Sequence, residues 1–439
     1  MDATQPKINR KLVQRSAVLA VAAAVLLAVY VWLTGQNKDV DLGSVHSAGW
    51  IAALQLQRDG GSRLVVIKPD GSIVPCPGYK SGSTDREFAW RPDGNRIFFS
   101  SDRQDKTYNI FRWNLATGQV ERRTLGKIAK SDPSFPVGDP GASHPLIVFS
   151  GEAWDLDPGS GKASQVFPIP PDKHKEVDTR DESSGERLGA FGLGAQQKVR
   201  TARYLKGKTY VVVIRRTDEG EMLVLQRLIP PEGKSPDEVK RDMQSYVVAA
   251  GDRIVIDVNP RTGTLVFASQ GFHFPNPNEI PDRFVKDGKV THPFEHAVQL
   301  FDPDSTEAPA GPVVASRDDA ACFGQIAVSP DGASLLMTAG PYHGSGDSEA
   351  KQLFVVPTES GGIQHGLKVF PEAGKSIGAS LIYSPSWSSD GRTIVFGLST
   401  QSGERALCSI GRDGKDFRNL TAGKGNFTNP KSSPQLAGG

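Results

Sequence analysis

The sequence predicts an all-β protein, a β-propeller of four-stranded antiparallel blades preceded by one N-terminal transmembrane helix. Two observations predict it: a short phrase that repeats along the chain, and a long apolar run near its start. The phrase joins the apolar end of one strand, a tight Asp-Gly or Thr-Gly turn and a buried strand, and it occurs at 89–99, 259–267, 328–336 and 386–396. Repetition of one supersecondary unit is typical of propellers and solenoids.

The apolar run predicts a membrane anchor over residues 16–34. Ser16–Leu33 contains no charged residue and approaches the ~20 residues that a helix needs to span a bilayer. Basic residues in the stub at 1–15 should keep the N-terminus in the cytoplasm. We therefore expect a single-pass protein of the bacterial inner (cytoplasmic) membrane, with its propeller in the periplasm or otherwise extracytoplasmic.

Two other kinds of leader are alternatives to this anchor. A cleaved signal peptide is disfavoured because the run exceeds the usual ~7–15 apolar residues and no Ala-x-Ala site follows it. A lipoprotein anchor is disfavoured because no cysteine precedes Cys76.

The repeated phrase predicts hairpins, because Asp-Gly tolerates the positive φ angles of a two-residue turn between antiparallel strands. After a linker at 35–48, the hairpins and the apolar runs around them divide residues 49–434 into seven blades. The predicted blades span Trp50–Pro77, Arg86–Leu125, Asp132–Phe167, Val199–Leu228, Arg253–Val313, Phe323–Phe370 and Leu381–Thr421. In the last blade the predicted strands are 381–387, 392–398, 405–410 and 417–421. A six-bladed ring is the alternative, because the blades at 132–167 and 199–228 are weakly marked.

Each end of the predicted propeller contains an incomplete blade. The first blade has no repeated phrase before it, and residues 426–434 look like the start of a blade that is not continued. We expect this C-terminal strand to complete the first blade and close the ring, since closure removes exposed strand edges. Residues 435–439 would remain as a tail.

The blades resemble the repeats of the TolB-like propeller family. The resemblance is carried by Trp90-Arg91-Pro92-Asp93-Gly94 with Ile97-Phe98-Phe99, by Pro385-Ser386-Trp387-Ser388-Ser389-Asp390-Gly391 with Ile394-Val395-Phe396, and by the closing Arg418-Asn419-Leu420-Thr421. It implies a propeller over most of the chain after about residue 49. TolB itself has a small α/β domain ahead of its propeller, for which the linker at 35–48 leaves no room, so TolB's partners are not carried over.

Charge and cysteine content exclude some classes of function. The formal net charge is +2, and the first fifteen residues carry four basic and one acidic side chain, which leaves −1 for the rest. A nearly neutral propeller is a poor partner for nucleic acid. Cys76, Cys322 and Cys408 fit no metal motif; we expect them to be buried and unpaired, with a Cys76–Cys408 disulfide as the alternative. We expect no cofactor and no metal.

Three insertions interrupt the blades. Residues 170–197 are rich in mixed charge and poor in apolar side chains, which is typical of a solvated loop. Residues 234–251 begin with a helix-capping sequence at Ser235–Glu238. A helix continuing from it would place five apolar residues on one face, either packed on the propeller or docking a partner: Val239, Met243, Tyr246, Val247 and Ala250.

The insertion at 270–296 departs most from a blade and supplies the candidate partner-contact loop. Exposed aromatic residues favour interfaces, and the candidate contact residues are Phe272, His273, Phe274, His292, Phe294 and His296. His292 and His296 are four residues apart beside Glu295, a spacing that could place two metal ligands on one helical face. Pro293 disfavours a helix there, so a contact surface, or a cover over one propeller face, is the better interpretation.

No catalytic motif accompanies these features. Gly344-Ser345-Gly346 lacks the Gly-x-Ser-x-Gly pattern of a nucleophile elbow, and too few residues follow the last blade for the hydrolase domain of propeller peptidases. We therefore expect a membrane-anchored propeller that acts as a protein–protein interaction or scaffold subunit in the cell envelope or a membrane complex. The alternative is a small-ligand-binding or hydrolytic propeller with its site at the central channel.

Overall fold

The structure is a computed structural model, and the residues it describes lie in the second of two compact units, Met1–Ser44 and Val45–Gly439. They are 49–168, 176–180, 198–218, 220–251, 253–273, 285–286, 289–290, 294–305, 314–316, 322–340, 350–358, 366–372, 380–400 and 402–434. The predicted anchor at 16–34, its flanking stub and linker, and the tail at 435–439 lie outside them. Within the described part of the chain, no helix is long and apolar enough to cross a membrane.

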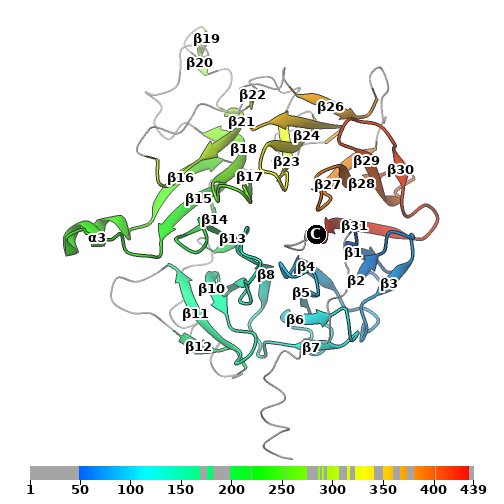
Figure 1. The fold of residues 1–439 in the computed structure, drawn as a ribbon, viewed down its shortest axis with the longest axis horizontal. Helices are drawn as coiled ribbons and strands as arrows, with labels where there is room; N and C mark the ends of the chain where they lie inside the picture. The colour runs from blue at the N-terminus through cyan, green and yellow to red at the C-terminus, as the bar shows by residue number, and fades with distance from the viewer. Residues whose placement is uncertain are drawn as a thin grey trace, which may run out of the picture. The chain divides into compact units, whose positions relative to one another are not determined.

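The second unit is a ring of seven antiparallel sheets (Figure 1). The prediction of seven blades is confirmed, and the six-bladed alternative is wrong. Blade 1 consists of β1 (Ile51–Leu56), β2 (Ser62–Ile67), β3 (Ile73–Pro75) and β31 (Asn426–Ser432); blade 2 of β4 (Asp85–Trp90), β5 (Arg96–Ser101), β6 (Asn109–Asn114) and β7 (Val120–Arg122). Blade 3 consists of β8 (Lys130–Ser134), β9 (Leu146–Phe149), β10 (Glu152–Leu156), β11 (Lys162–Phe167) and β12 (Glu176–Asp178).

Blade 4 consists of β13 (Val199–Leu205), β14 (Tyr210–Thr217), β15 (Gly220–Arg227) and β16 (Tyr246–Gly251); blade 5 of β17 (Arg253–Val258), β18 (Leu265–His273), β21 (Phe294–Phe301) and β22 (Val314–Ser316). Blade 6 consists of β23 (Cys322–Val328), β24 (Ser334–Gly340), β25 (Gln352–Pro357) and β26 (Leu367–Phe370); blade 7 of β27 (Leu381–Trp387), β28 (Thr393–Ser399), β29 (Arg405–Gly411) and β30 (Arg418–Asn419). A separate hairpin pairs β19 (Val285–Lys286) with β20 (Lys289–Val290).

The ring closes as predicted, with the C-terminal strand β31 as the innermost strand of blade 1. It runs antiparallel to β1, from Leu56 opposite Asn426 to Ile51 opposite Ser432. Figure 1 shows β31, in red, beside the blue strands of the N-terminal blade. The closure pairs the inner edge of β1 and gives blade 1 a fourth strand.

Apolar side chains pack between neighbouring sheets and form the core. Trp90 and Trp387 end the inner strands of blades 2 and 7 and are 8% and 6% exposed. Each indole nitrogen donates to a carbonyl of an adjacent blade, Trp90 to Lys431 O at 3.0 Å and Trp387 to Ala327 O at 3.0 Å. The repeated phrase therefore joins blades as well as strands.

A buried ion pair in blade 2 also contacts blade 1. The Arg103 guanidinium lies 2.6 Å from Asp85 Oδ2, and both side chains are almost fully buried. The carboxylate also accepts hydrogen bonds from Leu64 N at 2.9 Å and from Ser101 Oγ at 2.6 Å. Removing one partner from such a pair strands an uncompensated charge, and the hydrogen bond from Leu64 N links the pair to blade 1.

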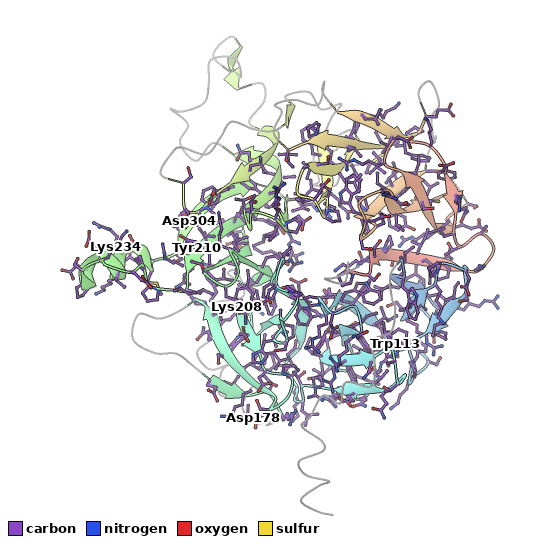
Figure 2. The ribbon with its side chains drawn as sticks, viewed as in Figure 1. Trp113, Asp178, Lys208, Tyr210, Lys234 and Asp304 are labelled. Carbon is purple, nitrogen blue, oxygen red and sulfur yellow. The ribbon has the colours of Figure 1, made fainter. Side chains whose placement is uncertain are left out.

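The insertion at 234–251 differs from its prediction. The helix α3 covers only Pro236–Asp242 and buries none of its residues, and 246–251 form β16, paired with β15. The predicted apolar helical face is therefore wrong beyond the first two turns, and so is its packing on the propeller. In Figures 1 and 2, α3 and Lys234 lie at the outer edge of blade 4, away from the channel.

Two smaller expectations can also be compared with the structure. Cys76 and Cys408 are buried and free, so the alternative disulfide between them is wrong. Most of the loop predicted at 170–197 lies outside the described residues, although 176–178 within it form β12, a fifth strand on blade 3.

Candidate functional site

The innermost strands of the blades surround the central channel, and most of them are interrupted by a bulge. The ladder between the inner strand and its neighbour shifts register in six blades and is continuous only in blade 5. Four bulge residues have positive φ angles although none is glycine: Glu87, Asp132, Ser384 and Asn429. Bulges re-aim side chains locally, and here these four place polar residues in the inner strands of blades 1, 2, 3 and 7.

A second layer of channel residues follows further along the inner strands, after the bulge in the six blades that have one. Every blade contributes one residue of this layer to a pocket at the end of the channel, and the seven are Ala89, Ser134, Arg203, Asp257, Ala327, Ser386 and Lys431. Three of them are charged and the other four are small. The small residues leave room at the floor of the pocket, and the charged residues give it its chemistry.

The pocket has a volume of about 580 Å³ and opens where the inner strands end. Its aromatic lining is Trp90, Phe135 and Trp387. Seven prolines complete much of the wall: Pro92, Pro133, Pro136, Pro140, Pro260, Pro330 and Pro434. Because proline fixes φ, this wall is stiff before any ligand arrives.

The charged residues at the floor lie close enough to influence one another electrostatically. Arg203 Nη1 lies 2.8 Å from Asp132 Oδ2 and donates to Ala202 O at 2.6 Å. Asp257 accepts hydrogen bonds from Val328 N at 2.7 Å and Val258 N at 2.9 Å. Blades 3 and 4 therefore meet through Asp132 and Arg203, and blades 5 and 6 meet through Asp257 and Val328.

Lys431 has the most available donors in this group. Its ammonium donates to Phe88 O at 2.6 Å, its one acceptor among the described residues, and an ammonium carries three N–H groups. Burial and the positive charge of Arg203 lower the pKa of Lys431 to about 8, and burial raises the pKa of Asp257. The floor can therefore donate hydrogen bonds to a carbonyl or carboxylate that enters the pocket.

The candidate contact loop is only partly described, and its backbone brings some of the predicted residues together. His273 lies opposite Phe294 in the ladder between β18 and β21, and Phe272 lies opposite Glu295. His296 lies opposite Ser316 on the other side of β21. Phe274 and His292 lie outside the described residues, and so does half of the alternative His292–His296 metal pair. In the described segments, no cluster of histidine, cysteine, aspartate and glutamate could hold a metal ion.

The pocket's charged residues were missed in the sequence, although a signal for them exists. When the repeated phrases are aligned on Trp90, Val258, Val328 and Trp387, the position just before these residues is the one that lines the pocket. In blade 5 this position holds the charged Asp257. A charge inside a buried strand is unusual unless it is paired or functional. Arg203 and Lys431 occupy the same position in blades 4 and 1, where the repeated phrase is not recognisable in the sequence.

Comparison with known proteins finds similar solved structures but no matching family or curated protein. No protein-family model and no curated protein matches the sequence. Among solved structures the chain is similar to TolB from Acinetobacter baumannii, with a TM-score of 0.44 and 14% identity, covering 93% of this chain and 70% of that one. It is also similar to an oligogalacturonate lyase in complex with manganese (TM-score 0.49, 14% identity, 85% of each chain) and to a prolyl endopeptidase (0.48, 11%, 89% of this chain and 55% of that one).

Proposed function

We propose that this chain is a membrane-anchored, extracytoplasmic interaction module whose propeller binds a segment of a partner protein at the pocketed end of its channel. The observation that carries the proposal is the composition of the pocket: stiff proline and tryptophan walls over a floor with the ammonium of Lys431. Apolar side chains of the partner would pack on the walls, and a carbonyl or carboxylate of its chain would accept from Lys431. A rigid site loses little entropy on binding.

The composition of the pocket also favours binding over hydrolysis. Its described lining includes no histidine and no cysteine, so it has no Ser–His or Cys–His pair of the kind that activates a nucleophile. The serines of the lining have no histidine beside them to take a proton. The anchor at 16–34 would hold the module at the inner membrane, facing a partner in the envelope.

Site-specific photo-crosslinking in native membranes tests the proposal. A photoreactive residue would replace Ser389 or Pro434, both in the pocket lining, and, as a control, Thr117 in the exposed turn between β6 and β7. β6 runs parallel to β4, so this turn lies on the same face of the propeller but away from the channel. We expect Ser389 and Pro434 to crosslink to the same one or two envelope proteins, identified by mass spectrometry, and Thr117 to give none of these products.

Two results would contradict the proposal. Identical products from all three positions would mean that the face is crowded without using the pocket. An absence of products above background, with the protein migrating alone, would favour the alternative of a propeller that binds a small ligand.

A further inference from the structure

A second pocket lies at the opposite end of the channel. The inner strand β27 begins at Leu381, which lines this second pocket, and ends at Trp387, which lines the first. The second pocket has a volume of about 460 Å³ and is formed by blades 5, 6, 7 and 1. It is therefore separate from the site of the proposed function, and both could be occupied at once.

The charge of this second pocket has one sign. Arg253 and Arg405 line it, and no aspartate or glutamate is among its described lining residues. The guanidinium of Arg405 has no partner among the described residues, whereas its backbone N–H donates to Asn426 Oδ1 at 2.8 Å. A guanidinium offers a planar fork of donors that matches a carboxylate or a phosphate.

Neutral polar groups line the same pocket beside the arginines. Asn429 has a φ of +58°, and its Oδ1 accepts from Ser384 Oγ at 2.9 Å, which leaves its amide N–H groups for another acceptor. The hydroxyl of Thr428 also lines the pocket. A non-glycine residue held at positive φ is a recurrent feature of ligand sites, and this one adds amide donors to the arginine charge.

Tyr383 supplies an apolar wall and not a reactive hydroxyl. Its hydroxyl donates to Phe427 O at 2.8 Å. This hydrogen bond fixes the ring and uses the hydroxyl proton, so the ring contributes mainly apolar surface to the pocket. A pocket with an aromatic wall, amide and hydroxyl groups, and a net positive lining matches a small molecule that has both hydroxyl groups and a negative charge.

We infer that this second pocket binds a small polyhydroxy organic anion, held through its carboxylate or phosphate by Arg405 and through its hydroxyl groups by Asn429 and Thr428. The shared chemistry is the anion on a hydroxyl-bearing carbon chain. Recognition of this kind rejects a neutral analogue, because the guanidinium then loses its partner.

Calorimetric titration of the full-length protein in detergent tests the inference with three probes: gluconate, glucose 6-phosphate and glucose. We expect saturable binding of at least one anion, and binding of glucose at least about tenfold weaker, as the loss of a charge-assisted hydrogen bond predicts. Gluconate and glucose 6-phosphate distinguish a carboxylate from a phosphate ligand.

Variants locate the binding. Arg405→Gln should weaken anion binding about tenfold or more, and Thr428→Val, which keeps the shape and the charge, should weaken it a few-fold. The matched control is Arg418→Gln, which removes the same charge from the exposed outer strand of the same blade and should leave binding unchanged. Circular dichroism and the melting temperature of each variant show whether it is folded.

The inference is overturned if neither anion binds at concentrations up to about 10 mM, if glucose binds as tightly as the anions, or if Arg405→Gln and Arg418→Gln behave alike. Crosslinking from Ser389 and Pro434 is measured at the other end of the channel, so failure here and failure of the proposed partner site are distinguishable.

Discussion

Lys431 shows at the scale of one residue how the channel changes ordinary chemistry. Its ammonium is enclosed with Arg203 and with the carboxylates of Asp132 and Asp257, and burial is the main reason why its pKa falls from 10.5 to about 8. Between about pH 8 and pH 10.5 the unfolded chain therefore binds more protons at this site than the folded protein does. The contribution of Lys431 to stability is fully present above about pH 10.5 and is lost as the pH falls through about 8.

Lys431→Met removes this titration. We expect the free energy of unfolding of the wild-type protein, relative to that of the variant, to rise from about pH 8 to about pH 10.5. Urea unfolding of both proteins across this range measures the difference, and other alkaline titrations, such as those of the buried thiols, cancel between them. If the free energies of unfolding of the two proteins changed in parallel with pH, Lys431 would have the same pKa in the folded and unfolded states, and the prediction would be wrong.

Charged channel residues such as Lys431 are the part of the site that is hardest to predict from the sequence. Trp90 and Trp387 belong to the repeated phrase, so the sequence marks their positions. The phrase does not mark Arg203 and Lys431, because a lone basic residue in a short strand is usually solvated, and only closure of the ring turns these two inward. The candidate loop at 270–296 was chosen by composition, which does not report where a loop lies.

At the scale of elements, turn and capping residues correctly predicted where strands and the helix begin. The strands predicted for blade 7 at 381–387, 392–398 and 405–410 are observed at Leu381–Trp387, Thr393–Ser399 and Arg405–Gly411. The helix start at Ser235 is also as predicted, with Glu238 accepting from Ser235 N at 2.9 Å. Residues 246–251 were misassigned because their apolar spacing suits a helix or a strand, and pairing with β15 decides between the two.

Ala249 distinguishes these two assignments by experiment. In β16 it is 4% exposed and packs in the core of blade 4, whereas it was not on the apolar face of the predicted helix. Ala249→Glu should therefore bury an unpaired carboxylate and reduce the free energy of unfolding by about 3 kcal/mol or more. The control Gln244→Glu adds the same charge at an exposed position and should leave the urea midpoint unchanged. Equal midpoints for both variants would contradict the strand assignment.

At the scale of the whole propeller, β31 determines whether the blades form a ring. It pairs with β1, accepts a hydrogen bond from Tyr383 of blade 7 at Phe427 O (2.8 Å), and accepts one from Trp90 of blade 2 at Lys431 O (3.0 Å). One strand thus links three blades and also supplies Lys431 to the first pocket and Asn429 to the second. Stability and both candidate sites should therefore fail together when this strand is lost.

Phe427→Ala tests this link without removing the strand. Phe427 is fully buried, so the cavity should lower the free energy of unfolding by about 3–5 kcal/mol. Phe417→Ala, at a side chain that is 47% exposed, is the matched control and should cost about 1 kcal/mol or less.

Deletion of residues 426–434 should have a larger effect than Phe427→Ala. It leaves the inner edge of β1 unpaired, and we expect a broadened urea transition and aggregation through that edge. A deletion variant that stayed monomeric with a sharp transition would show that the other six blades hold the ring without its closing strand.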